Sequence, residues 1–154
     1  MTPHLTTFPD TRRAVLTLME DDGTASLVRH FQRIPTRQEV ADAIHEHVNA
    51  QTDAKILTAF TWQGRSVYLS TENQFNFKAA YDLAVQTAGA TLPVTFKLGE
   101  DEEGTPTYYR FEDMPTFTDF YTSAIAFINQ ALNDGWQQKD AATEWAQTLP
   151  IPPG

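Results

Sequence analysis

The chain contains no cysteine. This absence excludes disulfide bonds, thiolate catalysis and zinc sites with cysteine ligands. It fits a reducing compartment, where structural disulfides are rare. Long apolar runs are absent too, because no stretch approaches the ~20 residues that a membrane-spanning helix needs. Residues 1–15 hold no apolar signal-peptide core. We therefore expect a protein without a membrane segment.

Basic residues are scarce. The chain has 11 lysines and arginines against 20 aspartates and glutamates, a formal net charge of -9. Residues 56–154 hold most of this excess, with 5 basic and 12 acidic residues. Such a surface repels phosphate backbones, so we expect no nucleic-acid partner. The charge favours solubility, and a basic partner is the alternative interpretation.

Motifs that carry catalytic chemistry are also absent. The chain has neither a G-x-S-x-G nucleophile turn nor a G-x-G-x-x-G or G-K-[ST] phosphate loop. His45 and His47 are two residues apart on a predicted helix, so they point in different directions and make no zinc pair. The acidic run Glu100 to Glu103 lacks the spacing of a calcium loop and predicts a solvated hairpin tip. We predict no catalytic residue, no metal, no cofactor and no enzymatic activity.

What the chain does have is enough apolar material for a core, with 41% hydrophobic and 12% aromatic residues. Its pattern predicts four parts. Residues 1–13 form a flexible arm that orders on contact, and residues 14–53 form a hairpin and a helix. Residues 54–137 form an α+β core, and residues 138–154 form a short helix and a tail.

Local signals predict the elements of the first part of the chain. Residues 14–31 alternate around an Asp22-Gly23 turn, which is typical of a hairpin. Thr36 and Glu39 form a capping box that begins a helix with apolar positions from Val40 to Val48.

Two further hairpin-and-helix pairs follow. The first is a hairpin over residues 56–69, turning at Gln63–Arg65, and a helix capped by Thr71 and Gln74 and ended by Gly89; Phe75 is expected to staple its first turn. The second is a hairpin over residues 94–111 with a loop at 99–106, and a helix capped by Thr116 and Asp119 and ended by Gly135. A last short helix spans 139–148. The predicted class is α+β: a small, mostly antiparallel sheet of hairpins with two amphipathic helices packed on one face, plus an N-terminal hairpin and helix.

Aromatic residues outside the predicted core faces are the candidate interface residues. These are Trp62, Tyr68, Tyr108, Trp136 and Trp145. Aromatic side chains in such positions often anchor interfaces. The alternative is that they cover the second face of the sheet or close the edge of the core.

From about residue 38 to 142, the order of parts resembles a domain-of-unknown-function family of phages and prophages. The matching pieces are "TWQGRSVYLSTENQFNFKAAYDLA", "LPVTFKLGEDEEGTPTYYRF" and "FTDFYTSAIAFINQALNDGW". Phe96 stands where the family often has tryptophan. Members are similar to small proteins encoded near tail-fibre or other virion genes, and the resemblance carries over no catalytic residue.

The resemblance implies a virion protein made in the host cytoplasm, with other phage structural proteins as partners. We expect a non-enzymatic structural or adaptor protein of a fibre, tail or head, and a homo-oligomer. One alternative is a fibre assembly chaperone that is not retained in the virion. A second is a hydrolase of unknown substrate that uses the acidic loop.

Overall fold

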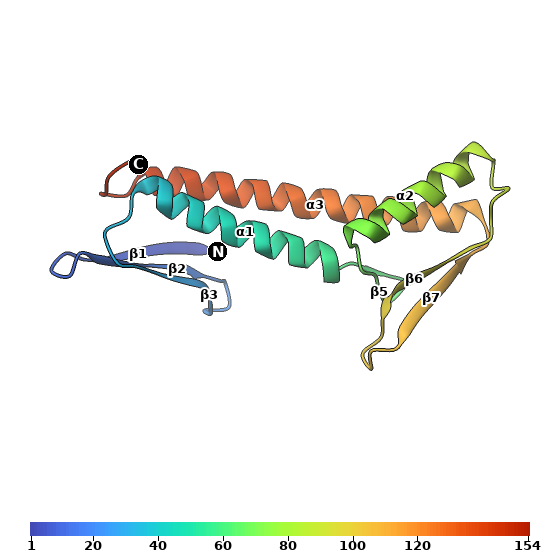
Figure 1. The fold of residues 1–154 in the computed structure, drawn as a ribbon, viewed down its shortest axis with the longest axis horizontal. Coiled ribbons are helices and arrows are strands. Elements are labelled where there is room, and N and C mark those ends of the chain that lie inside the picture. The colour runs from blue at the N-terminus through green and yellow to red at the C-terminus, as the bar shows by residue number, and fades with distance from the viewer. The chain divides into compact units, whose positions relative to one another are not determined.

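The computed structural model describes residues 1–154, in an α+β fold with three helices and three small antiparallel sheets (Figure 1). The chain divides into two compact units. We call residues 1–50 and 134–154 the terminal unit, and residues 51–133 the central unit. The predicted α+β class is confirmed. The hairpins nevertheless form separate sheets rather than one.

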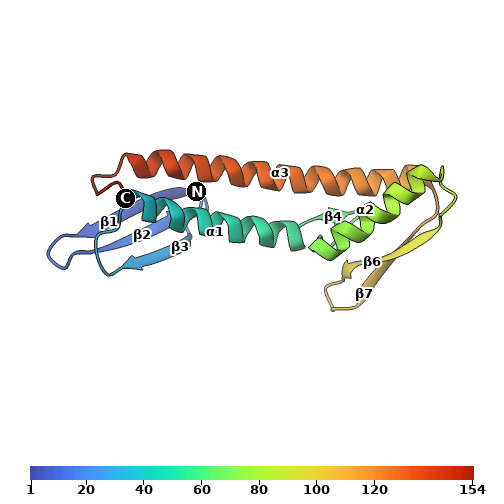
Figure 2. The ribbon, with the colours of Figure 1, turned by 45° about the horizontal axis from the view of Figure 1, so that its top comes forward.

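The terminal unit contains a three-stranded antiparallel sheet with the order β1-β2-β3 (Figure 2). Its strands are β1 (Thr2–Phe8), β2 (Arg13–Met19) and β3 (Ala25–Phe31). The hairpin predicted over residues 14–31 is confirmed. Its turn has Gly23 at a φ of 85°, and the Asp22 carboxylate accepts the Thr24 N–H at 2.9 Å.

The predicted flexible arm over residues 1–13 is wrong, because residues 2–8 form the edge strand β1. β1 pairs with β2 along its whole length, from Thr2 opposite Met19 to Phe8 opposite Arg13. Pro3 is tolerated because an edge strand has one unpaired side. Leu5 packs on the core that contains Leu16. The region is therefore part of the folded unit.

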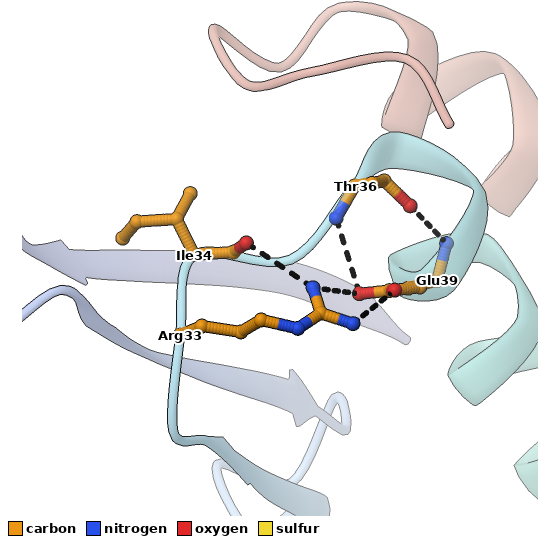
Figure 3. Close-up of polar contacts among 4 residues, drawn as sticks. All are labelled: Arg33, Ile34, Thr36 and Glu39. Atoms are coloured by element: carbon orange, nitrogen blue, oxygen red, sulfur yellow. Dashed lines mark hydrogen bonds and ion pairs between the residues drawn. The ribbon is translucent and has the colours of Figure 1, made fainter.

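Helix α1 (Arg37–Thr58) begins with the predicted capping box (Figure 3). The Glu39 N–H donates to Thr36 Oγ1 at 3.1 Å, and the Thr36 N–H donates to Glu39 Oε2 at 3.2 Å. The Arg33 guanidinium donates to both carboxylate oxygens of Glu39, with 2.8 Å between Nη1 and Oε2. The bonds from Arg33 are the largest cause that holds the pKa of Glu39 below its ordinary value. The Glu39 carboxylate therefore joins Arg33 to the capping box at the start of α1.

The lowered pKa of Glu39 predicts a pH-dependent contribution to stability. A carboxylate with a depressed pKa stabilises the fold above its unfolded pKa and loses this effect as the pH falls through the folded pKa. Glu39→Gln is therefore expected to be less stable than the parent chain at about pH 7, and the gap should narrow as the pH falls below the ordinary glutamate pKa of 4.5 and close below the lowered folded pKa. Urea unfolding at several pH values measures it. Glu144→Gln, at an exposed site on another helix, is the matched control; a gap that persists in acid would contradict the assignment.

The strand predicted from Ile56 is wrong, because α1 continues to Thr58. A short run such as "ILTAF" is ambiguous between helix and strand, and the packing of Ile56 against the central core decides for helix. Only β4 (Thr61–Trp62) and β5 (Arg65–Ser66) form the second hairpin. Its turn is the predicted one, with Gln63 at a φ of 49° and Gly64 at 74°.

Helix α2 (Thr71–Gln86) begins one residue earlier than its predicted cap requires. Ser70 is the N-cap, and its Oγ accepts the Asn73 N–H at 3.1 Å. The predicted end is confirmed to within one residue, since Ala88 after the C-cap Thr87 is the first residue with a positive φ, at 52°, and the Gly89 N–H donates to the Ala84 carbonyl at 2.8 Å. The predicted staple by Phe75 is wrong, because that side chain is 69% exposed.

The third hairpin is confirmed as β6 (Val94–Glu100) and β7 (Pro106–Phe111), with a shorter loop than predicted. It meets the residues after β5 through a hydrogen bond from the Tyr68 N–H to the Leu98 carbonyl at 2.8 Å. Gly99 allows this approach, because a Cβ there would lie 2.7 Å from the Ser66 carbonyl oxygen.

Helix α3 (Met114–Gln147) corrects three predictions at once. Asp113 is the capping residue, and its Oδ1 accepts the Thr116 N–H at 2.8 Å. Gly135 does not end the helix, because residues 136–149 contain no proline and the interior cost of a glycine is only about 1 kcal/mol. The short helix predicted at 139–148 is the continuation of α3.

Each unit has its own core. The terminal core is aliphatic and joins β2 to α1 and the end of α3; its buried members are Leu16, Leu18, Val40, Ala43, Ile44, Val48, Ala142 and Ile151. The central core is aromatic, and its rings meet mostly edge to face or tilted. Its fully buried rings are Phe111, Phe117 and Phe120.

Candidate interaction surfaces

Trp62 is a core residue, which corrects its predicted place outside the core. Its side chain is only 5% exposed, and its indole N–H donates to Asp119 Oδ2 at 2.9 Å. The ring lies edge-on to Tyr109 and Phe120, at centroid distances of 5.0 and 5.1 Å. β4 therefore directs Trp62 inward, where its one polar atom has a partner. It is not available to a binding partner.

The other four predicted interface residues divide into two pairs. Tyr68 and Trp145 are half-buried, and Trp145 packs against the terminal core. Tyr108 is 64% exposed on β7 of the central unit, and Trp136 is 56% exposed on α3 in the terminal unit. The sequence prediction therefore selected one large exposed aromatic residue on each unit. Their role in an interface stays a prediction.

Helix α2 carries an exposed apolar ridge that the sequence prediction missed. Phe75 and Leu83 are 69% and 49% exposed, and Ala79 lies between them on the same exposed face. The opposite side of the helix packs inward through Phe77, Tyr81 and Ala84. The signal was present in the sequence, because residues four apart share a helix face. We call Phe75, Ala79 and Leu83 the α2 ridge.

The outer face of the three-stranded sheet is a second candidate surface. The register places Thr17 between His4 and Val28, and Val15 between Thr6 and His30. Val28 is 52% exposed. The outward positions include no carboxylate, although the whole chain is strongly acidic.

A groove of about 370 Å³ lies at one end of this sheet. Its apolar walls include Phe8, which is 46% exposed, and Arg13 is its only charged side chain. The lining residues are Phe8, Thr11, Arg13, Ala14, Val15, His30, Phe31 and Gln32. Both the groove and the outer face belong to the terminal unit.

The acidic loop between β6 and β7 is built as a turn. Asp101 Oδ1 accepts the N–H groups of Glu103 and Thr105, both at 2.9 Å. Glu100 pairs with Lys97 at 3.7 Å, an exposed contact worth little. Asp101 therefore has a structural task, while Glu102 and Glu103 are exposed at the tip.

His45 and His47 both make hydrogen-bonding contacts within the terminal unit. His45 Nε2 lies 2.9 Å from Thr143 Oγ1 and 3.0 Å from the Lys139 carbonyl, which ties α1 to α3. His47 Nε2 lies 3.3 Å from Ser26 Oγ on β3.

No group of three or more histidine, aspartate and glutamate side chains converges on a common point. None of the helices has both the length and the apolar composition for a bilayer span.

In comparisons with known proteins, no family model, no curated protein and no solved structure matches the chain.

Proposed function

We propose that the chain is a non-enzymatic structural or adaptor protein of a phage particle, attached to a fibre, tail or head component. The observation that carries the proposal is that each unit exposes its own large apolar side chains. Val28 and Trp136 lie on the terminal unit, and Phe75 and Tyr108 lie on the central unit. An adaptor needs two surfaces, one for each partner, and exposed apolar patches commonly mark such surfaces.

The phage setting rests on the resemblance in the order of elements from about residue 38 to 142. The virion is the proposed location, after synthesis in the host cytoplasm, and other virion proteins are the proposed partners. The alternative is an assembly chaperone that holds a fibre protein while it folds and then leaves. Both functions use the same exposed side chains, so location separates them.

Mass spectrometry of gradient-purified particles tests the proposal. A structural or adaptor protein is expected in a fixed ratio to a known particle protein. Trp136→Ser and Tyr108→Ser should each lower this ratio. Glu144→Gln should not lower it, because this exposed position carries no large apolar side chain. A chain abundant in the lysate but missing from particles would overturn the virion role and favour the chaperone.

The hydrolase alternative uses the carboxylates of the acidic loop. Because Asp101 closes the turn, replacing it would disturb the hairpin whether or not the loop is catalytic. Glutamine at Glu100, Glu102 and Glu103 with Asp101 retained is the cleaner variant. A hydrolase that works through this loop would lose its activity in that variant, and an adaptor would keep its place in the particle.

A further inference from the structure

We infer that α2 pairs with α2 of a second copy of this chain, antiparallel, across a two-fold axis at Ala79. The inference deepens the proposed function, on which it rests, because it names one partner of the exposed surfaces. The ridge is also a property of the chain alone, so it is testable without a particle.

The α2 ridge has the form that helices use to pack on one another. Its members are spaced at i, i+4 and i+8, and such rows are the ridges through which packed helices contact one another. The middle member is alanine, so two backbones can approach closely at the crossing point. The outer members are large and exposed, with Phe75 at 69% and Leu83 at 49%. Neither side chain has a role in the central core.

The ridge is symmetric about its centre. Phe75 lies four residues before Ala79, and Leu83 lies four residues after it. A two-fold axis at Ala79 reverses the chain direction, so Phe75 of each copy meets Leu83 of the other. Two equivalent Phe–Leu contacts then flank one alanine–alanine crossing, the isologous arrangement that a closed dimer requires.

The charges beside the ridge also agree with this pairing. Lys78 and Asp82 form an ion pair on one flank of α2. In an antiparallel two-fold pair the same flank of both helices lies on one side of the interface, which places Lys78 about 3 Å along the axis from both Asp82 and Lys78 of the partner subunit. The four side chains make a neutral cluster. Further out, Glu72 lies seven residues before Ala79 and faces Gln86 seven residues after it, so no like charges oppose each other.

The size of the surface sets the expected strength. A stable interface buries about 800 Å² on each partner, more than one helix face of 16 residues offers. We therefore expect a reversible dimer with a dissociation constant in the micromolar range or weaker. A high local concentration, such as a symmetric assembly provides, would favour it.

Sedimentation equilibrium of the full chain over a wide concentration range measures the dimer. Phe75→Glu is expected to weaken self-association at least tenfold, because it places a charge in the Phe–Leu contact. Val85→Glu is the matched control. Val85 is 53% exposed on the same helix but about 120° around the axis from Ala79, so its variant should associate like the parent chain. A monomer at every concentration, or an equal loss in both variants, would overturn the inference.

A charge exchange tests the geometry itself. Lys78→Glu and Asp82→Lys should each weaken self-association, since each makes the flank carry one sign of charge. An equimolar mixture of the two variants should associate, because the introduced glutamate of one chain then meets the introduced lysine of the other, and the retained Asp82 meets the retained Lys78. Far-UV circular dichroism checks that both single variants remain helical. A mixture that associates no more strongly than either variant alone would contradict the antiparallel pairing. The chain's presence in particles would still test the proposed function separately.

Discussion

Replacing Phe120 by alanine is expected to destabilise the central unit by about 3–5 kcal/mol, the usual cost of removing a buried phenylalanine ring. Phe120 is fully buried, and its ring lies 5.0 to 5.1 Å from the centroids of Phe111, Phe77 and Trp62. Removing it leaves a cavity between α2, α3 and β7. The neighbouring rings are packed on several sides and can move little to fill the cavity. The loss in the free energy of unfolding should therefore lie toward the upper end of this range.

Fluorescence of Trp62 during urea unfolding measures this loss, because its indole contacts Phe120. Phenylalanine at positions 136 and 145 makes Trp62 the single reporter. Phe75→Ala in the same background is the matched control, since it deletes the same ring from a site that is 69% exposed. It should cost less than about 0.5 kcal/mol. Equal losses in the two variants would contradict the assigned core.

The sequence predicted best where the signal is local. The Asp22-Gly23 turn, the Gly64 turn and the Gly89 helix end each depend on backbone conformations that favour glycine, and all three have positive φ in the structure. The capping box of Thr36 and Glu39 depends on side chains three residues apart. Such features require no knowledge of the rest of the fold.

The errors lie where distant packing decides. Residues 56–58 suit a strand or a helix by composition, and contact with the central core selects the helix. Gly135 could end or continue a helix, and the following residues continue it. Trp62 was predicted outside the core because its partner Asp119 lies 57 residues away in the chain. The discrepancy between Ser70 and Thr71 is smaller, a shift of one residue at a helix start.

The exposed ridge of α2 could have been predicted from the spacing of Phe77, Ala80, Tyr81 and Ala84. Those residues define the inward face, so Phe75, Ala79 and Leu83 fall on the outward face. The prediction that Phe75 staples the first turn of the helix left this outward face unassigned. A large apolar residue that fits no core face is better treated first as a candidate contact.

Deleting residues 1–8 is expected to unfold the terminal unit. This result distinguishes an integral strand from a flexible arm, because removing a flexible arm would leave the unit folded. The deletion removes every pairing between β1 and β2, together with the contacts of Met1 and Leu5 with the terminal core. β2 becomes an edge strand, and Leu16 and Leu18 lose part of their cover. A two-stranded hairpin is marginal by itself, so the remaining sheet depends on its packing against α1 and the end of α3.

Hydrogen exchange followed by mass spectrometry measures the result in each unit. Amides of β2, β3 and residues 37–50 should lose protection, whereas those of the central unit should keep it, because its core lies wholly within residues 51–133. His4→Ser with Thr6→Ser is the control, since two outward positions of β1 change and Leu5 remains. Unchanged protection after the deletion would show that residues 1–8 contribute nothing to folding. Lost protection in the deletion alone establishes β1 as part of the terminal unit, whose exposed outer face then includes that strand.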